Sequence, residues 1–211
     1  MNLRYCQLAV TALTLGLGGC VGTSLDKSLK SPAYHGGAVQ KVAVVAVDER
    51  VLVRQGFENR FARQMVEHGQ SAMVTYELLS LPEIKADKQA ATARFLQAGA
   101  DSVLIIRLAN SATQAHTTQA TRNIFVPVVT GYGYDNWYDY YSVGFVNMGT
   151  AWSDSKTEVY LEVSLHELKT GQRIWAGGTV TVLKEGMDRV EQMDPIVSKV
   201  LGALRKDGLI H

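Results

Sequence analysis

KVAVVAV, residues 41–47, is a continuous valine-rich run that follows a single lysine at its first position. A run of this kind is typical of a strand that is covered on both faces. Strands of that type lie in parallel sheets with helices on either side. The stretch therefore predicts an α/β domain.

The residues after this run predict two crossover helices and two more strands. The first helix ends at Gly69, and Asp48 is a candidate for its cap. The second begins at Ser80 with the spacing of a capping box and ends before Gly99. Apolar residues recur on one face of each helix: Val53, Phe57, Phe61 and Met65, then Ile84, Ala91, Phe95 and Ala98. Strands 71–76 and 101–108 complete a β-α-β-α-β unit with parallel pairing.

The pattern changes to strict alternation after residue 150. Residues 157–165 and 173–183 each alternate apolar and polar side chains and are separated by a short turn, which predicts an antiparallel hairpin with one face buried. On this interpretation His166 lies on the solvated outer face, and Gly177-Gly178 marks a bulge or a close approach. Asp194-Pro195 opens a last amphipathic helix that closes near Gly208.

These elements predict one mixed sheet in a single domain over residues 41–211. Its fold class is α/β, with α+β character at the C-terminal end, and a long Gly/Tyr-rich insertion occupies residues 110–155. About 170 residues suit one domain with a real core.

The N-terminus has the features of a bacterial secretory signal. Arg4 precedes a short apolar run, and Leu17-Gly18-Gly19-Cys20 resembles the lipobox of bacterial lipoproteins. The resemblance implies that residues 1–19 are removed and that Cys20 carries acyl chains such as palmitate. The alternative is a buried apolar helix with a chance cysteine. The same resemblance implies the outer membrane, because Val21 rather than Asp follows the cysteine. Residues 20–40 are predicted to be a lipidated flexible tether.

Composition excludes several classes of function. Cys6 lies in the signal and Cys20 carries the lipid, so the mature body has no thiol for a disulfide, a nucleophile or a metal site. The mature chain has 20 basic and 20 acidic side chains, and this balance disfavours nucleic acid as a partner.

The sequence contains no familiar catalytic motif such as GxSxG, HExxH or a Walker loop. The five histidines are scattered, so no metal site and no cofactor are predicted. Asp48, Glu49 and Arg50 follow the first strand, where α/β sheets place their sites, yet helix capping with a solvated Glu49–Arg50 pair is favoured. Asp101 is interpreted as a turn residue. The chain is therefore expected not to be an enzyme, with a hydrolase as a remote alternative.

The segment 131–145, GYGYDNWYDYYSVGF, is the strongest functional clue. Tyrosine gives broad contact area at low rotamer cost, and glycine lets the backbone fit a partner. The candidate binding residues are Tyr132, Tyr134, Trp137, Tyr138, Tyr140, Tyr141, Asp135 and Asp139. They can contact an envelope protein or a second copy, stack on a glycan with Asp135, Asn136 and Asp139 bonding hydroxyls, or rest at a bilayer interface. The alternative is that the rings only cover the core.

Two further pieces carry a family resemblance, GADSVLIIRL at 99–108 and the run ExxTGxxIW from Glu167 to Trp175. With the lipobox, they resemble bacterial lipoproteins of unknown function that have a periplasmic α/β domain of the kind seen in LpoB, CsgG and the amino-terminal domain of TolB. The resemblance implies a scaffold, activator or assembly factor and transfers no catalytic residue. We therefore expect a membrane-anchored, periplasm-facing lipoprotein that binds an envelope protein or itself. The alternative is a lipoprotein that binds glycan, peptidoglycan or a small ligand through 131–145.

Overall fold

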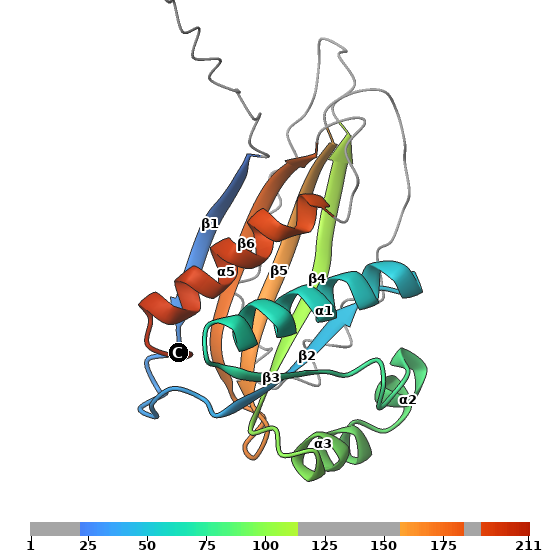
Figure 1. The fold of residues 1–211 in the computed structure, drawn as a ribbon, viewed down its shortest axis with the longest axis vertical. Coiled ribbons are helices and arrows are strands. Elements are labelled where there is room, and N and C mark those ends of the chain that lie inside the picture. Colours follow the sequence, from blue (N-terminus) through green and yellow to red (C-terminus); the bar gives the residue numbers. More distant parts are fainter. Residues whose placement is uncertain (1–21, 114–156, 184–190) are drawn as a thin grey trace, which may run out of the picture.

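The computed structural model describes residues 22–113, 157–183 and 191–211. These residues form a mixed α/β fold around one sheet with the strand order β1-β6-β5-β4-β2-β3 (Figure 1). The strands are β1 (Thr23–Lys30), β2 (Lys41–Val47), β3 (Ser71–Val74), β4 (Ser102–Thr113), β5 (Thr157–Glu167) and β6 (Arg173–Leu183). The helices are α1 (Val51–Glu67), α2 (Leu81–Ala86), α3 (Lys88–Gln97) and α5 (Asp194–Lys206), with the short 3₁₀ turn η1 (Glu191–Met193) before α5.

The sheet has a parallel part and an antiparallel part. β2 pairs in parallel with β3 and with β4, as the β-α-β-α-β pattern predicted. β4 pairs antiparallel with β5, β5 with β6, and β6 with β1. The predicted α/β class with one mixed sheet is thus confirmed, and the predicted hairpin has become the centre of the antiparallel part.

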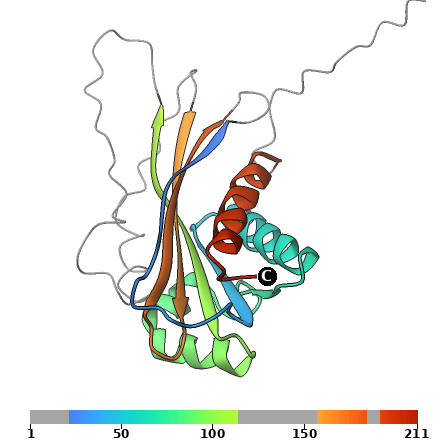
Figure 2. The ribbon, with the colours of Figure 1, turned by 90° about the vertical axis from the view of Figure 1, so that its left-hand side faces the viewer.

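Helices cover both faces of β2, which explains its unbroken apolar sequence. α1 and α5 lie on one face of the sheet, whereas α2 and α3 lie on the other (Figures 1 and 2). Val42, Val44 and Ala46 belong to the core under α1 and α5. Ala43, Val45 and Val47 belong to the core under α2 and α3. Alternate residues of one strand therefore serve two cores.

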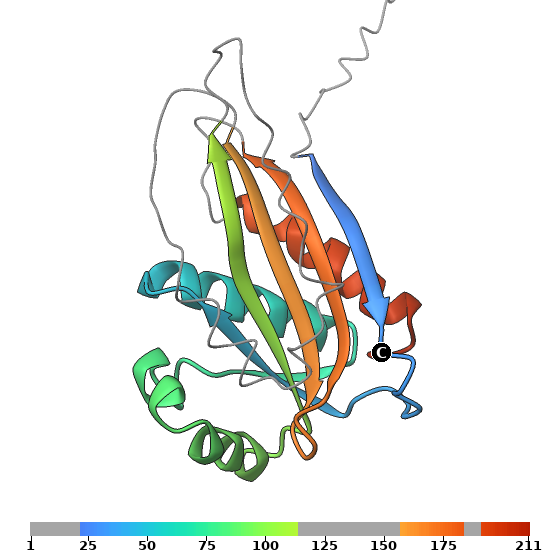
Figure 3. The same cartoon turned by 180° about the vertical axis from the view of Figure 1, so that it is seen from behind.

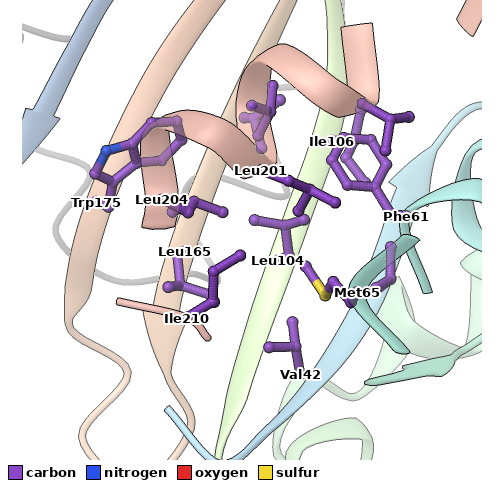
Figure 4. Packing of buried hydrophobic residues seen from close by; sticks show 14 of the residues in the cluster. Val42, Phe61, Met65, Leu104, Ile106, Leu165, Trp175, Leu201, Leu204 and Ile210 are labelled. Atoms are coloured by element: carbon purple, nitrogen blue, oxygen red, sulfur yellow. The ribbon is translucent and has the colours of Figure 1, made fainter. Parts of the chain in front are cut away.

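The larger core joins the two halves of the chain. Phe61 and Met65 of α1 point toward Leu104 of β4, and Leu201 and Leu204 of α5 close over the same sheet face (Figure 4). All five side chains are fully buried. At about 1.5–3 kcal/mol for each such side chain, this contact dominates the docking of α1 and α5.

The predicted flexible tether is wrong for residues 23–30. They form β1, an edge strand that pairs antiparallel with β6 from Thr23↔Thr181 to Lys30↔Trp175. The sequence TSLDKSLK looks like a tether because it is polar, but an edge strand has one bonded neighbour and can stay polar without loss. Gly177 and Gly178 of β6 lie opposite β1 in this pairing.

The second predicted helix is interrupted. Its capping box is confirmed, since Ser80 N donates to Glu83 Oε2 at 2.7 Å and Glu83 N donates to Ser80 Oγ at 3.3 Å. The helix nevertheless stops at Asp87, whose backbone is extended and whose carboxylate accepts from Ala90 N at 2.9 Å to cap α3. Apolar spacing continues across the break, so periodicity alone predicted a single helix.

Candidate functional site

The carboxyl end of β2 was one candidate site, and its charged residues bond to one another. Asp48 is buried and its carboxylate accepts from Arg50 at three atoms: N at 2.9 Å, Nε at 2.9 Å and one terminal nitrogen at 2.6 Å. The hydrogen bonds that the Arg50 side chain donates to the Asp48 carboxylate are the main cause that raises the pKa of Arg50. The expected capping role of Asp48 and the expected Glu49–Arg50 pair are wrong, because Arg50 itself occupies the N-cap position of α1 and folds back onto Asp48.

A second carboxylate at this edge was missed by the sequence analysis. Glu58 is a charged residue on the side of α1 that carries the apolar stripe, and it is completely buried. Its oxygens accept from three backbone amides, Ala46 N at 3.2 Å, Thr75 N at 2.6 Å and Tyr76 N at 2.8 Å. They also accept from Arg54 Nε at 2.8 Å. One sequence feature could have indicated this cluster: Arg54 and Glu58 are oppositely charged, four residues apart and next to the apolar stripe.

Arg54 completes this cluster. It donates to Leu79 O at 2.9 Å as well as to Glu58, and Thr75 Oγ1 donates to Val44 O at 2.9 Å. The cluster joins α1 to the ends of β2 and β3 and to the loop before α2. Because its members satisfy each other, the charged residues at this edge of the sheet hold the fold together rigidly.

Polar residues are also buried within β4 and β5. Arg107 and Glu162 are directly opposite in register and form an ion pair, with side-chain exposures of 8% and 1%. Ser164 and His166 follow at two-residue spacing on the same side of β5, and both are fully buried. By register these residues share the sheet face of Val103 and Ile105, which belong to the core under α2 and α3.

His166 is therefore not the solvated residue that the alternation predicted. Its Nε2 lies 2.8 Å from Ser164 Oγ and its Nδ1 lies 3.4 Å from Gly171 O. Burial lowers the pKa of His166 to about 3, so the ring is neutral at ordinary pH. The Ser164–His166 contact has the atoms of a nucleophile and a base, but neither side chain is exposed to solvent, so a substrate has no access to them.

A third feature is the end of the sheet where β1 begins. Gly22 O accepts from Val182 N at 3.1 Å, and Thr23 Oγ1 lies 3.1 Å from Thr181 Oγ1. Thr113, the last residue of β4, lies opposite Thr157, the first residue of β5, in the same part of the sheet. The ends of β1, β4, β5 and β6 form what we call the sheet tip, and they project beyond α1 (Figures 1 and 3).

The predicted site residues lie outside the described residues. Cys20 precedes Gly22 by two positions, and the whole segment 131–145 falls in the connection 114–156. The structure does describe the points where that connection starts and ends, Thr113 and Thr157. Asp101 has the structural role predicted for it, since its carboxylate accepts from Gln40 N at 2.7 Å and Lys41 N at 3.1 Å.

A shallow hollow of about 290 Å³ lies between α3 and the β5–β6 turn, with Thr92, Leu96 and Lys169 in its lining. Over residues 22–113, 157–183 and 191–211, no three His, Cys, Asp or Glu side chains are placed to hold a metal ion. None of the helices described here has the length and apolar character needed to cross a membrane.

Neither a protein-family model nor a curated protein sequence matches this chain. Some solved structures are similar in fold. The PelC dodecamer from Paraburkholderia phytofirmans is 12% identical, with 90% of this chain and 100% of that chain covered and a TM-score of 0.49. A point variant of the same PelC is 13% identical, with 87% and 98% covered and a TM-score of 0.47.

The lipoprotein GNA1162 from Neisseria meningitidis is 15% identical, with 79% of this chain and 98% of that chain covered and a TM-score of 0.42. The resemblance to LpoB, CsgG and TolB stays a prediction.

Proposed function

We propose that this chain is a bacterial envelope lipoprotein, anchored in the outer membrane through acylated Cys20, whose periplasmic domain acts as a non-enzymatic binding, scaffold or assembly factor. The sequence Leu17-Gly18-Gly19-Cys20 supports the anchor. The domain after it is a stable platform, since its two cores and its buried charged clusters bind α1 and α5 to a single sheet.

One observation carries the binding role. Thr113 and Thr157 are paired directly across neighbouring antiparallel strands, yet residues 114–156 connect them. A connection between such strands usually needs about 2–5 residues, and a 43-residue insertion at this point is typical of a functional element. It contains the tyrosine-rich segment 131–145, which we propose as the surface that contacts an envelope protein.

The state of the polar groups supports binding over catalysis. Asp48 forms an ion pair with Arg50, and Glu58 accepts hydrogen bonds from three backbone amides and Arg54. A catalytic acid or base must reach a substrate and change its protonation during the reaction. Carboxylates that hold α1 to β2 and β3 are committed to the fold instead.

In-cell photocrosslinking from position 138 tests this function. Tyr138 is replaced by a photoreactive phenylalanine analogue, and the captured material is identified by mass spectrometry. Tyr76, a partly exposed tyrosine beyond β3 that donates to Asn59 Oδ1, provides the matched control position. We expect one envelope protein, or the lipoprotein itself, to be captured from position 138 and not from position 76.

Two results would contradict the protein-contact role. Muropeptide or polysaccharide adducts at position 138 would indicate a glycan-binding lipoprotein. Adducts at position 138 that match those at position 76 would indicate that the tyrosines only cover the core.

A further inference from the structure

The domain begins almost at the proposed anchor. Gly22 already accepts a hydrogen bond from Val182 N at 3.1 Å, and Thr23 is in register with Thr181. Val21 is therefore the only residue between Cys20 and the hydrogen-bonded sheet. Two residues reach at most about 7 Å even when fully extended.

That length is comparable to the polar layer of a bilayer, which adds roughly 5–8 Å on each side of the hydrocarbon core. An acylated Cys20 has its chains in the hydrocarbon and its backbone at the inner boundary of this layer. We propose that the lipid on Cys20 holds the sheet tip against the headgroups, so that the domain stands end-on on the membrane. This inference rests on the proposed lipid anchor and adds to it a defined membrane-contacting surface.

The residues at the tip suit a headgroup layer. Thr23, the first residue of β1, is partly exposed, and Ser24 next to it is exposed. Beside them, Val159, Tyr160, Val180 and Val182 are partly exposed. Hydroxyl groups, short apolar side chains and a tyrosine are compatible with the boundary between lipid headgroups and water, where Tyr is enriched.

The strands of the sheet tip are longer than β2 and extend beyond its end. β2 ends at Val47, which pairs with Arg107, whereas β4 continues for six more residues to Thr113. At 3.3 Å for each residue, the four-stranded tip extends about 20 Å beyond the end of β2. This projection sets the ends of the four strands apart from α1 along the sheet (Figure 3).

The short link, not charge, sets this orientation. The mature side chains are balanced between 20 basic and 20 acidic residues, so the domain has no strong net attraction to anionic lipids. A flexible tether over residues 21–40 would have allowed the domain to rotate freely. Pairing of β1 with β6 removes that freedom and places both attachment points of the connection 114–156, Thr113 and Thr157, next to the bilayer.

The opposite end of the domain then faces the periplasm. The β5–β6 turn carries exposed Lys169 and Thr170, and strand β6 separates it from Thr181. The separation along the strand is roughly 30 Å. A probe at Lys169 should therefore lie well outside the headgroup layer.

Depth-dependent quenching in liposomes tests the orientation. The full-length lipoprotein is purified from membranes and reconstituted in phosphatidylethanolamine–phosphatidylglycerol vesicles that contain headgroup-nitroxide lipid. Ser24, an exposed residue of β1, and Lys169 are each replaced by cysteine in separate proteins and labelled with a small fluorophore. Acylation blocks Cys20, so each protein has a single reactive thiol.

We expect the label on Ser24→Cys to be quenched at least twofold more than the label on Lys169→Cys. A 12-residue Gly/Ser insertion after Val21, with a reach of about 19 Å, should abolish the difference. Equal quenching at the two labels would overturn the end-on orientation. Persistence of the difference after the insertion would overturn the role of the short link, and would instead indicate that the tip binds lipid unaided.

Flotation of the same vesicles separates this inference from the anchor itself. Wild type should float with the vesicles and Cys20→Ala should not. If wild type does not float, the proposed anchor fails and the orientation fails with it. If wild type floats but the labels are quenched equally, only the orientation is wrong.

Discussion

Thr23 Oγ1 and Thr181 Oγ1 are 3.1 Å apart, so the first residue of β1 is hydrogen-bonded to β6 three positions after Cys20. This contact turns a segment that looked like a tether into the edge of the sheet. If Cys20 is acylated as proposed, this pairing leaves only Val21 between the lipid and the hydrogen-bonded sheet. Further along the strand, Lys30 Nζ donates to Asp207 O at 3.0 Å, which connects the other end of β1 to the C-cap residue of α5.

Hydrogen–deuterium exchange should distinguish a strand from a tether in residues 23–30. In an antiparallel edge strand, about every second amide is bonded to its neighbour. We expect a peptide that covers 23–30 to keep a substantial part of its amide protons for minutes, whereas an exposed peptide around His35 exchanges within seconds. Complete exchange of 23–30 on the faster timescale would contradict the pairing with β6.

Removal of the Glu58 carboxylate should strongly destabilise the domain. Glu58→Ala leaves three backbone amides and the buried Arg54 without their acceptor, and breaking a buried pair in this way costs about 3–5 kcal/mol. The matched control is Glu67→Ala on the same helix, which removes the exposed Arg63–Glu67 pair at 3.7 Å. That change should cost less than about 1 kcal/mol.

Urea denaturation, followed by circular dichroism, measures both changes in the free energy of unfolding. If Glu58→Ala and Glu67→Ala had similar effects, the cluster at the ends of β2 and β3 would not hold α1 in place.

The stability of the domain should fall as pH decreases because of His166. Its folded pKa is about 3 and its unfolded value is 6.5, so the unfolded chain takes up a proton below pH 6.5 that the folded chain refuses. The contribution of the neutral His166 ring to the free energy of unfolding is complete above pH 6.5, and it is lost as the pH falls toward 3. Between pH 7 and pH 5 we expect a loss of about 2 kcal/mol from this residue.

Denaturation of His166→Gln at the two pH values checks this prediction, since the variant should be less stable at pH 7 and should lose that pH dependence. The exposed His35→Gln protein should retain it. An unchanged pH dependence in His166→Gln would show that other groups cause the loss.

Gly177 should not tolerate a side chain. A methyl group there would meet the Trp175 ring at 2.3 Å, and that ring is fully buried with its Nε1 donating to Asp207 Oδ2 at 2.9 Å. Gly177→Ala should cost about 1–3 kcal/mol by overpacking. Gly202→Ala in α5, where nothing lies within 4 Å, should instead stabilise by about 0.5–1 kcal/mol.

Thermal unfolding of the two alanine variants is sufficient to test this difference. Opposite shifts in Tm are expected, and a Gly177→Ala protein as stable as wild type would mean that Trp175 is free to move aside.

Several elements could be predicted from the sequence because a single local pattern of residues indicated each of them. The two-sided burial of 41–47 matched an unbroken apolar run, and the capping box at Ser80 has the expected hydrogen bonds. The β6 strand has the predicted bounds 173–183. A bulge or a close approach was predicted at Gly177-Gly178, and the structure shows that Gly177 closely approaches the Trp175 ring.

Other features depended on contacts that no local pattern encodes. β1 is polar, and only its pairing with β6 makes it a strand. Glu58 looks like a surface residue until amides from β2 and from the end of β3 meet it in space. His166 alternates as a solvated residue would, because a period of two residues gives the two faces of a strand but does not say whether the second face is buried. The binding role of the tyrosine-rich segment 131–145 is a hypothesis that rests on its composition.

The most direct test of the central claim is the mass of the N-terminal peptide of the protein extracted from bacterial membranes. We predict that the mature chain begins at Cys20, lacks residues 1–19, and carries a diacylglyceryl group with a further acyl chain on its amine. The Cys20→Ala protein should retain its leader and lack these groups. A wild-type chain that begins at Met1, or at an unmodified Cys20, would contradict the lipid anchor and with it the end-on placement of the sheet tip.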